Sequence, residues 1–328
     1  MPKPTTTKPD TALVIAAAII AAGTIALLAW ILLSGRGGVE LLGFPEGSTD
    51  VISYAGRFPA PDDAALGNPI GIDSDGEHIY VAESDAGRVA VFTLDGRRLD
   101  DIVVPVADGR TEVYPSEVAL LGDNRLAVID SASQTVLMLS TEGDGSLASV
   151  IGASGEHAPG PPTALTYGDG ELFIADGDAH AVLVFSAESG AYLRTLGEGL
   201  TPPVMYIGGM FIGDDGLHIA DSNAGRVLVI DTQSGELVRI FPERYSLPRG
   251  IVRGLDSEEF IVDTFNKTVV VVTDTGTSRA QTADLGEPLA ALLSPRDACW
   301  IAEDQRLYVT DAESGEVVVY NVRLPVVP

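Results

Sequence analysis

The stretch GIDSDGEHIYVAESDAGRVAVF, residues 71–92, contains the pattern that decides the fold, because the rest of the chain repeats it. A close copy, GDDGLHIADSNAGRVLVI, occupies residues 213–230, and four weaker copies fill the remaining sequence. Aligning the copies superimposes one acidic residue from each, at spacings of 42 to 48 residues: Glu83, Asp130, Asp176, Asp221, Asp263 and Asp311. A self-similar period of this length is typical of propellers, solenoids and other arrays.

Each copy predicts a strand, a tight polar turn and a second strand. Apolar residues stand two positions before each acid and six and eight positions after it, and the sixth position is valine in every copy. Such alternation on both sides of a turn is typical of paired strands. A proline precedes each acid by 14 to 18 residues: Pro69, Pro115, Pro162, Pro203, Pro248 and Pro295. We expect each proline to open an inner strand, where a missing N–H costs least.

With a fourth strand after the third, each copy becomes a four-stranded antiparallel meander. Six such units predict an all-β fold, a six-bladed β-propeller over residues 50–328, in which only short and protected sheet edges remain. Residues 50–55, DVISYA, form an extra strand before the first copy, and the last copy ends just after its third strand. We therefore expect residues 50–55 to supply the outer strand of the sixth blade and to close the ring.

The repeats resemble the NHL-repeat family of six-bladed propellers. The resemblance is carried by YVAES at residues 80–84 with GRV at 87–89, and by IADSN at 219–223 with GRV at 225–227. The segment from Tyr54 to Pro69 is also similar to an NHL entry segment. The resemblance implies an interaction or ligand-sensing module, of the kind that some membrane-anchored bacterial or archaeal receptors carry. Related six-bladed folds include lactonases and lyases, so an enzyme is the alternative, and fold alone does not decide between them.

The N-terminal region predicts a membrane anchor. Residues 1–10 form a polar, proline-rich tail, and residues 11–33 contain no charge. A helix of that length would extend roughly 34 Å, enough to cross a bilayer. The run is longer than the apolar core of a cleaved signal peptide and has no small-residue cleavage site after it. We expect an uncleaved transmembrane helix, followed by a linker at residues 34–49.

Flanking charges predict the orientation of this anchor. Lys3 and Lys8 precede the apolar run and Arg36 follows it. Basic residues collect on the cytoplasmic side of a span. We therefore expect a single-pass protein of the cell membrane, with a cytoplasmic N-terminus and the propeller outside.

Composition excludes some partners. The formal net charge is −27, and no basic patch stands out in the sequence, so we expect no nucleic-acid binding. The one cysteine, Cys299, cannot form a disulfide within the chain and falls in a predicted strand. We interpret it as a small buried apolar residue.

The six repeated acids are interpreted as structural. They recur in every blade, and an aspartate after a strand commonly accepts hydrogen bonds from the turn that follows it. The acidic turns at residues 73–77 and 213–216 hint at calcium, but the ligand spacing of a calcium loop is missing. The four histidines show no metal-binding spacing, so we expect no cofactor and no catalytic residue, although a metal held between blades stays open: His78, His157, His180 and His218.

Function is expected where the copies differ. Loops that enter the inner strands share one face of a propeller with the turns after the second strands. The residues that follow the six prolines are Ile70, Ser116, Thr163, Val204, Arg249 and Arg296. Arg249 and Arg296 would stand in adjacent blades and hold an anionic group, such as a carboxylate, on a small ligand or a protein partner. In the alternative interpretation, these arginines pair with acids such as Asp256 or Asp297.

We therefore predict a membrane-anchored propeller that acts as a binding or scaffold module. The alternative is a propeller enzyme, a lactonase-like hydrolase or a lyase, with a metal in its central channel. An enzyme of this kind needs at least three histidine, aspartate or glutamate side chains that converge in the channel. A binding module should instead show apolar or aromatic side chains on an exposed face.

Overall fold

The computed structural model describes residues 51–61, 63–106, 110–141, 146–151, 157–254 and 258–323, except for the side chain of residue 148. No helix in these ranges is long and apolar enough to cross a membrane. The predicted tail, span and linker at residues 1–10, 11–33 and 34–49 lie outside the described residues.

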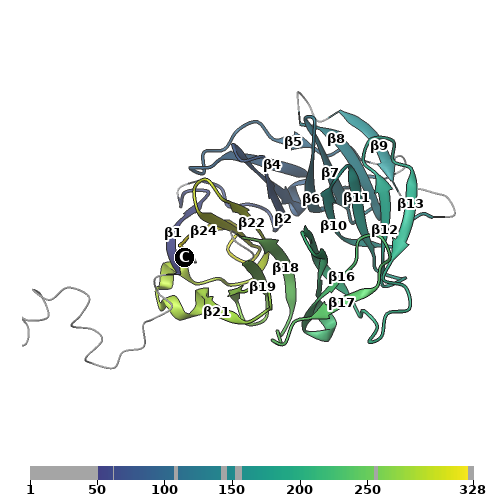
Figure 1. Cartoon of the computed structure of the whole chain (residues 1–328). Helices are drawn as coiled ribbons and strands as arrows, with labels where there is room; N and C mark the ends of the chain where they lie inside the picture. The colour runs from purple at the N-terminus through teal and green to yellow at the C-terminus, as the bar shows by residue number, and fades with distance from the viewer. Residues whose placement is uncertain are drawn as a thin grey trace, which may run out of the picture. The chain divides into compact units, whose positions relative to one another are not determined.

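The described strands form six four-stranded antiparallel sheets, as the sequence predicts (Figure 1). From the inside outwards, the first three blades are β2 (Pro69–Ser74), β3 (His78–Glu83), β4 (Arg88–Thr93) and β5 (Ile102–Val103); β6 (Pro115–Gly122), β7 (Arg125–Asp130), β8 (Thr135–Ser140) and β9 (Leu147–Ile151); β10 (Pro162–Gly168), β11 (Glu171–Asp176), β12 (Ala181–Ser186) and β13 (Tyr192–Leu196).

The other three blades follow the same plan. They are β14 (Ile207–Gly213), β15 (Gly216–Asp221), β16 (Arg226–Ile230) and β17 (Leu237–Ile240); β18 (Pro248–Arg253), β19 (Glu259–Asp263), β20 (Thr268–Val272) and β21 (Ser278–Gln281); β22 (Pro295–Ile301), β23 (Arg306–Asp311), β24 (Glu316–Val322) and β1 (Ile52–Phe58).

The blades form a closed ring. Each innermost strand contacts the innermost strands of both neighbouring blades, in the cyclic order β2, β6, β10, β14, β18, β22 and back to β2. The ring is closed by β1, which pairs with β24 from Ile52 opposite Val322 to Phe58 opposite Val317. The first strand of the propeller is therefore the outer strand of its last blade, so both ends of the ring are held by backbone hydrogen bonds.

Buried side chains lie in six clusters, one between each pair of adjacent blades. Because every sheet is covered on both faces, the second and third strands are apolar almost throughout. In β20, for example, Val269 to Val272 are all buried. Removing one such side chain from water contributes about 1.5–3 kcal/mol.

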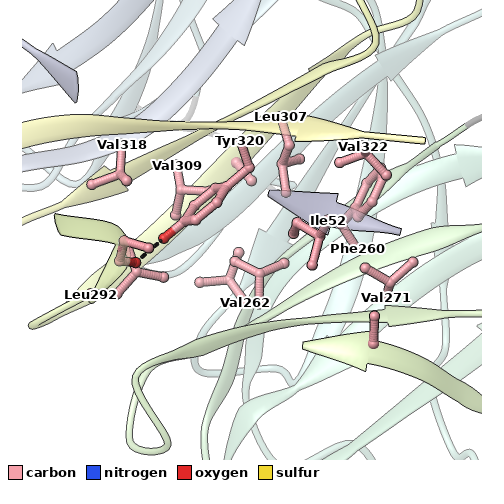
Figure 2. Close-up of a cluster of buried hydrophobic side chains, with 14 residues drawn as sticks. Ile52, Phe260, Val262, Val271, Leu292, Leu307, Val309, Val318, Tyr320 and Val322 are labelled. Carbon is pink, nitrogen blue, oxygen red and sulfur yellow. Dashed lines mark hydrogen bonds between the residues drawn. The ribbon is translucent and has the colours of Figure 1, made fainter. Parts of the chain in front are cut away.

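The cluster between blades 5 and 6 includes the closing strand (Figure 2). Ile52 of β1 packs there with Phe260 and Val322. Tyr320 is fully buried in the same cluster, and its hydroxyl donates a hydrogen bond of 2.6 Å to the carbonyl of Ala290. The cluster thereby couples ring closure to the packing of the fifth blade.

The predicted role of proline is correct in five blades and wrong in the fourth. Pro69, Pro115, Pro162, Pro248 and Pro295 each begin an innermost strand. In the fourth blade β14 begins at Ile207, and Ile207 is the residue that pairs with Asp221. Pro203 lies four residues earlier in the entry loop, so Gly208, not Val204, takes the position of the two arginines.

Candidate functional site

The repeated acids bind the loops at one face of the propeller, which we call the entry face. Each carboxylate accepts at least one backbone N–H from the loop that enters its own blade; the donors, in blade order, include Gly67, Tyr114, Gly160, Met205, Leu247 and Leu293. Asp130, Asp176, Asp263 and Asp311 also accept N–H groups from the turn after their strand. These acids therefore join two loops within each blade.

Glu83 and Asp221 accept hydrogen bonds from an arginine side chain, where the other acids accept N–H groups of the following turn. Arg88 Nε lies 2.6 Å from Glu83 Oε2, and Arg226 Nε lies 3.0 Å from Asp221 Oδ2. In both blades the turn ends at a glycine in the left-handed region, with φ of 64° and 62°, which explains the Gly-Arg-Val sequence that follows the acid.

The entry face also carries Arg249 and Arg296. The residue before each arginine pairs with the acid of its blade, Pro248 with Asp263 and Pro295 with Asp311. Both arginines are therefore the second residues of their innermost strands, β18 and β22, at the mouth of the central channel. These two strands are neighbours in the ring.

Neither arginine is in an ion pair within the described ranges. The Nε atoms of Arg249 and Arg296 are both buried and have no hydrogen-bond partner. Burial lowers the pKa of Arg296, the charge of Arg249 lowers it further, and Asp311 opposes both effects. The two guanidinium groups are therefore near enough to repel each other.

The sequence names two carboxylates as alternative partners of these arginines, and the structure describes one of them, Asp297. Asp297 Oδ2 accepts the backbone N–H of Ile72 at 3.2 Å, across the junction with the first blade. Asp256 lies outside the described residues. The mouth therefore carries two arginines without an ion pair in the described ranges, and Glu117 and Asp311 are near enough to act on them electrostatically.

Three carboxylic acids line the channel below the mouth, and sequence reasoning missed all of them as a group. They are Asp73 on β2, Glu117 on β6 and Asp297 on β22. Glu117 crosses towards the first blade, because its Oε2 lies 2.8 Å from the point where a Cβ on Gly71 would stand. Gly71 is needed for this approach, since any side chain there would overlap Glu117.

Burial raises the pKa of all three acids. The pKa of Asp297 rises to about 7 and that of Asp73 to about 6. The pKa of Glu117 is raised well above its ordinary value by burial and by the charge of Asp297, while Arg249 opposes the shift. A group of acids that holds protons near neutral pH can donate and accept hydrogen bonds, and can act in proton transfer.

These acids share a cavity of about 220 Å³ with several apolar side chains. Met210, Phe211, Ile251 and Trp300 are among its lining residues, and Cys299 also contributes. Cys299 is buried, and burial raises the pKa of its thiol first, ahead of the charges of Asp73 and Asp297. The thiol is therefore held in its protonated, unreactive form.

The entry face exposes large apolar side chains. Tyr114, Met205, Phe265 and Leu293 are 40%, 49%, 71% and 42% exposed. Tyr114, Met205 and Leu293 lie on entry loops that the repeated acids bind, and Phe265 lies in the turn after β19, on the same face. Exposed apolar side chains around a charged mouth are typical of a binding surface.

The histidines do not come together. His78 contacts Asp75, His157 stacks on Tyr192, and His218 contacts Asp215 and Glu259. Across the described ranges, no group of three or more histidine, cysteine, aspartate or glutamate side chains is arranged to hold a metal ion.

Comparison with known proteins shows the fold. No protein-family model matches the chain, and no curated protein matches it either. Virginiamycin B lyase from Staphylococcus aureus is similar in structure, with a TM-score of 0.58 and 15% identity over 83% of this chain and 100% of the lyase. A protein of unknown function from Bacteroides thetaiotaomicron gives a TM-score of 0.63 and 16% identity over 83% of this chain and 76% of that one.

Hydrazine synthase from Kuenenia stuttgartiensis is a third structural neighbour, with a TM-score of 0.56 and 13% identity over 82% of this chain and 99% of that one. At these identities the likeness establishes the fold alone. The chain is a six-bladed β-propeller, and its structural neighbours include enzymes.

Proposed function

We propose that this chain is an NHL-type propeller that binds a carboxylate-bearing ligand or partner between Arg249 and Arg296, while residues 11–33 anchor it in a membrane with the propeller outside. The observation that carries the binding proposal is the arginine pair itself. Two guanidinium groups stand at adjacent positions of the ring, both Nε atoms are buried without a partner, and no described carboxylate pairs with either.

A carboxylate fits this arrangement for a physical reason. A guanidinium is planar and presents parallel N–H donors that match the two oxygens of a carboxylate. Hydrogen bonds to charged groups contribute about 1.5–3 kcal/mol each. Binding would also relieve the repulsion that lowers the pKa of Arg296.

The exposed side chains Tyr114, Met205, Phe265 and Leu293 support a ligand with apolar parts next to its carboxylate. They lie on the entry face and come from four different blades. A hydrophobic carboxylic acid or a polypeptide with an exposed carboxylate would contact both features.

The test is a calorimetric titration of the full chain with benzoate and succinate, and with benzamide and succinamide as uncharged counterparts. Wild-type protein should bind the acids and not the amides. Arg249→Ala/Arg296→Ala should lose the binding, while Arg97→Ala, an exposed arginine in the turn between β4 and β5 at the opposite face, should retain it. Equal binding by the double variant and the wild type would refute the proposal.

The anchor is supported by the charge-free run at residues 11–33 and by the basic residues before it. Its test is independent of the ligand. Carbonate washing should leave the full chain in the membrane fraction, and protease added to intact cells should digest the propeller. Complete protection of the propeller would contradict the orientation.

A second candidate function is acid–base catalysis in the channel. It is favoured by the convergence of Asp73, Glu117 and Asp297 with raised pKa values, and by the presence of a lyase among the structural neighbours. Elemental analysis of the purified chain tests the metal-dependent form of this candidate. A stoichiometric metal that is lost in Glu117→Gln/Asp297→Asn would favour catalysis over simple binding.

A further inference from the structure

A second cavity lies between blades 4 and 5, at the face opposite the channel mouth. Its volume is about 180 Å³. Its lining includes Phe211, His218, Arg239, Arg253 and Glu259. In the register of β18 and β19, Arg253 lies opposite Glu259, at the end of β18 that is far from Pro248. The arginine pair at the mouth is at the other end of the strand. The cavity is therefore separate from the proposed carboxylate site.

A buried histidine forms one wall. His218 is 2% exposed, and its ring stacks on Phe211 with centroids 4.4 Å apart. Its Nε2 lies 2.7 Å from Asp215 Oδ1. Its Nδ1 approaches Glu259 Oε1 at 3.0 Å, although the alignment of the two groups does not make a hydrogen bond. The contact joins the second strand of blade 4 to that of blade 5.

Glu259 is the unusual group in this cavity. It is 3% exposed, and its Oε2 atom has no hydrogen-bond partner. A buried carboxylate oxygen without a hydrogen-bond donor is costly, because it has lost its hydration, and the contact of His218 with Oε1 leaves Oε2 without a donor. Glu258, the residue before β19, is similarly buried but contacts Arg279 at 3.0 Å, so burial of an acid at this point of the chain does not itself prevent an ion pair.

The arginines of the cavity are bound to other acids. Arg239 pairs with Asp215 and donates to the carbonyl of Asp274, and Arg253 Nη2 lies 2.6 Å from Asp214 Oδ2. Four acids and two arginines line the cavity. In the described part of the chain, no lysine or arginine is within ion-pair distance of Glu259. The lining therefore has more acids than arginines, and Glu259 Oε2 has no hydrogen-bond donor.

We propose that this cavity binds a small organic cation, an ammonium or guanidinium group, with one N–H donated to the carboxylate of Glu259. Such a group supplies positive charge to a lining in which acids outnumber arginines, and it brings an N–H donor to the Glu259 carboxylate. The volume fits a group of a few heavy atoms, since it lies below the range of sites for drug-sized ligands. The aromatic ring of Phe211 provides the apolar part of the wall.

The probes are methylguanidinium and methylammonium, added to the full chain and followed by ligand-observed NMR and thermal unfolding. Both should bind in the millimolar range and raise the unfolding temperature. Tetramethylammonium, which has no N–H, should bind at least tenfold more weakly. Equal binding of tetramethylammonium would show a general attraction to acidic protein and would overturn the proposal, as would tighter binding of Mg²⁺ or Ca²⁺ at the same cavity.

Two neighbouring glutamates make a matched pair of variants. Glu259→Gln should weaken methylguanidinium binding at least tenfold, because it removes the negative charge that attracts the cation. Glu258→Gln should leave binding unchanged and lower stability, because it breaks the pair with Arg279. Unchanged binding in Glu259→Gln would refute the assignment.

A third variant keeps the proposal testable if Glu259→Gln fails to fold. Arg253 is at the surface end of the cavity, and its charge raises the local potential near Glu259. Arg253→Gln should bind methylguanidinium several-fold more tightly. A loss of affinity in this variant would show that the cation does not occupy the cavity.

Discussion

Replacing Asp297 by asparagine should stabilise the protein, and the gain should grow with pH. The pKa of Asp297 is raised from its ordinary value of 3.8 to about 7, mainly because the carboxyl is buried in the channel. Between these two values the native state holds a proton that the unfolded state has released. Stability therefore falls as the pH rises through this range, and it falls no further above the native pKa.

The magnitude follows from the shift. One pKa unit corresponds to about 1.4 kcal/mol, so the cost of Asp297 is roughly 1.5 kcal/mol at pH 5 and about 4 kcal/mol at pH 8. Asparagine has the same shape as aspartate and retains an oxygen that can accept the N–H of Ile72, but it does not ionise, so it carries none of this free-energy cost. The stabilisation by Asp297→Asn should therefore be about 2–3 kcal/mol larger at pH 8 than at pH 5.

The assay is urea unfolding of the full chain at both pH values, followed by the fluorescence of Trp300, which lines the same cavity. Asp231→Asn is the control with the opposite sign. N–H groups of Ser234 and Gln233 lower the pKa of this exposed acid, so its contribution to stability exists near neutral pH and is lost as the pH falls. Equal effects of Asp297→Asn at pH 5 and pH 8 would refute the argument for a buried, proton-holding channel.

Two further changes test the packing and the repeated acids. Asp311→Ala should lower the free energy of unfolding in urea by about 3–5 kcal/mol, because the N–H groups of Leu293 and Ser294 lose their hydrogen bonds to the carboxylate. Asp311→Asn should lower it by about half as much. A decrease below about 1 kcal/mol in Asp311→Ala would contradict a structural role. Tyr320→Phe should cost about 1–2 kcal/mol by leaving the Ala290 carbonyl without its donor, and no change would show that water replaces the hydroxyl.

The fold was predictable from the sequence because period-2 apolar positions and the repeated acid recur in every blade. The start of the innermost strand of blade 4 was not predictable in this way. Pro203 is the residue type expected there, but cross-strand pairing begins at Ile207. Register depends on the partner strand, which a single repeat does not reveal.

The arginine pair was found from its departure from the other copies, whereas the channel acids were missed. Glu117 and Asp297 are far apart in the chain and meet only because the ring brings β6 and β22 to either side of β2. The sequence did contain a signal for them. Glu117 and Asp297 stand at one position of the repeat, and the other four blades have a small residue there: Gly71, Ala164, Gly209 and Gly250. His218 and Glu259 carried no comparable signal, because their contact depends on the packing of two blades.

The central claim is that Arg249 and Arg296 together hold a carboxylate. Its most direct test is a crystal structure of the chain with 4-bromobenzoate, in which anomalous scattering from bromine locates the ligand. The account predicts a carboxylate within about 2.7–2.9 Å of both guanidinium groups at the channel mouth. Guanidinium groups paired instead with Asp256 or another acid of the protein, and no ligand at the mouth, would contradict it.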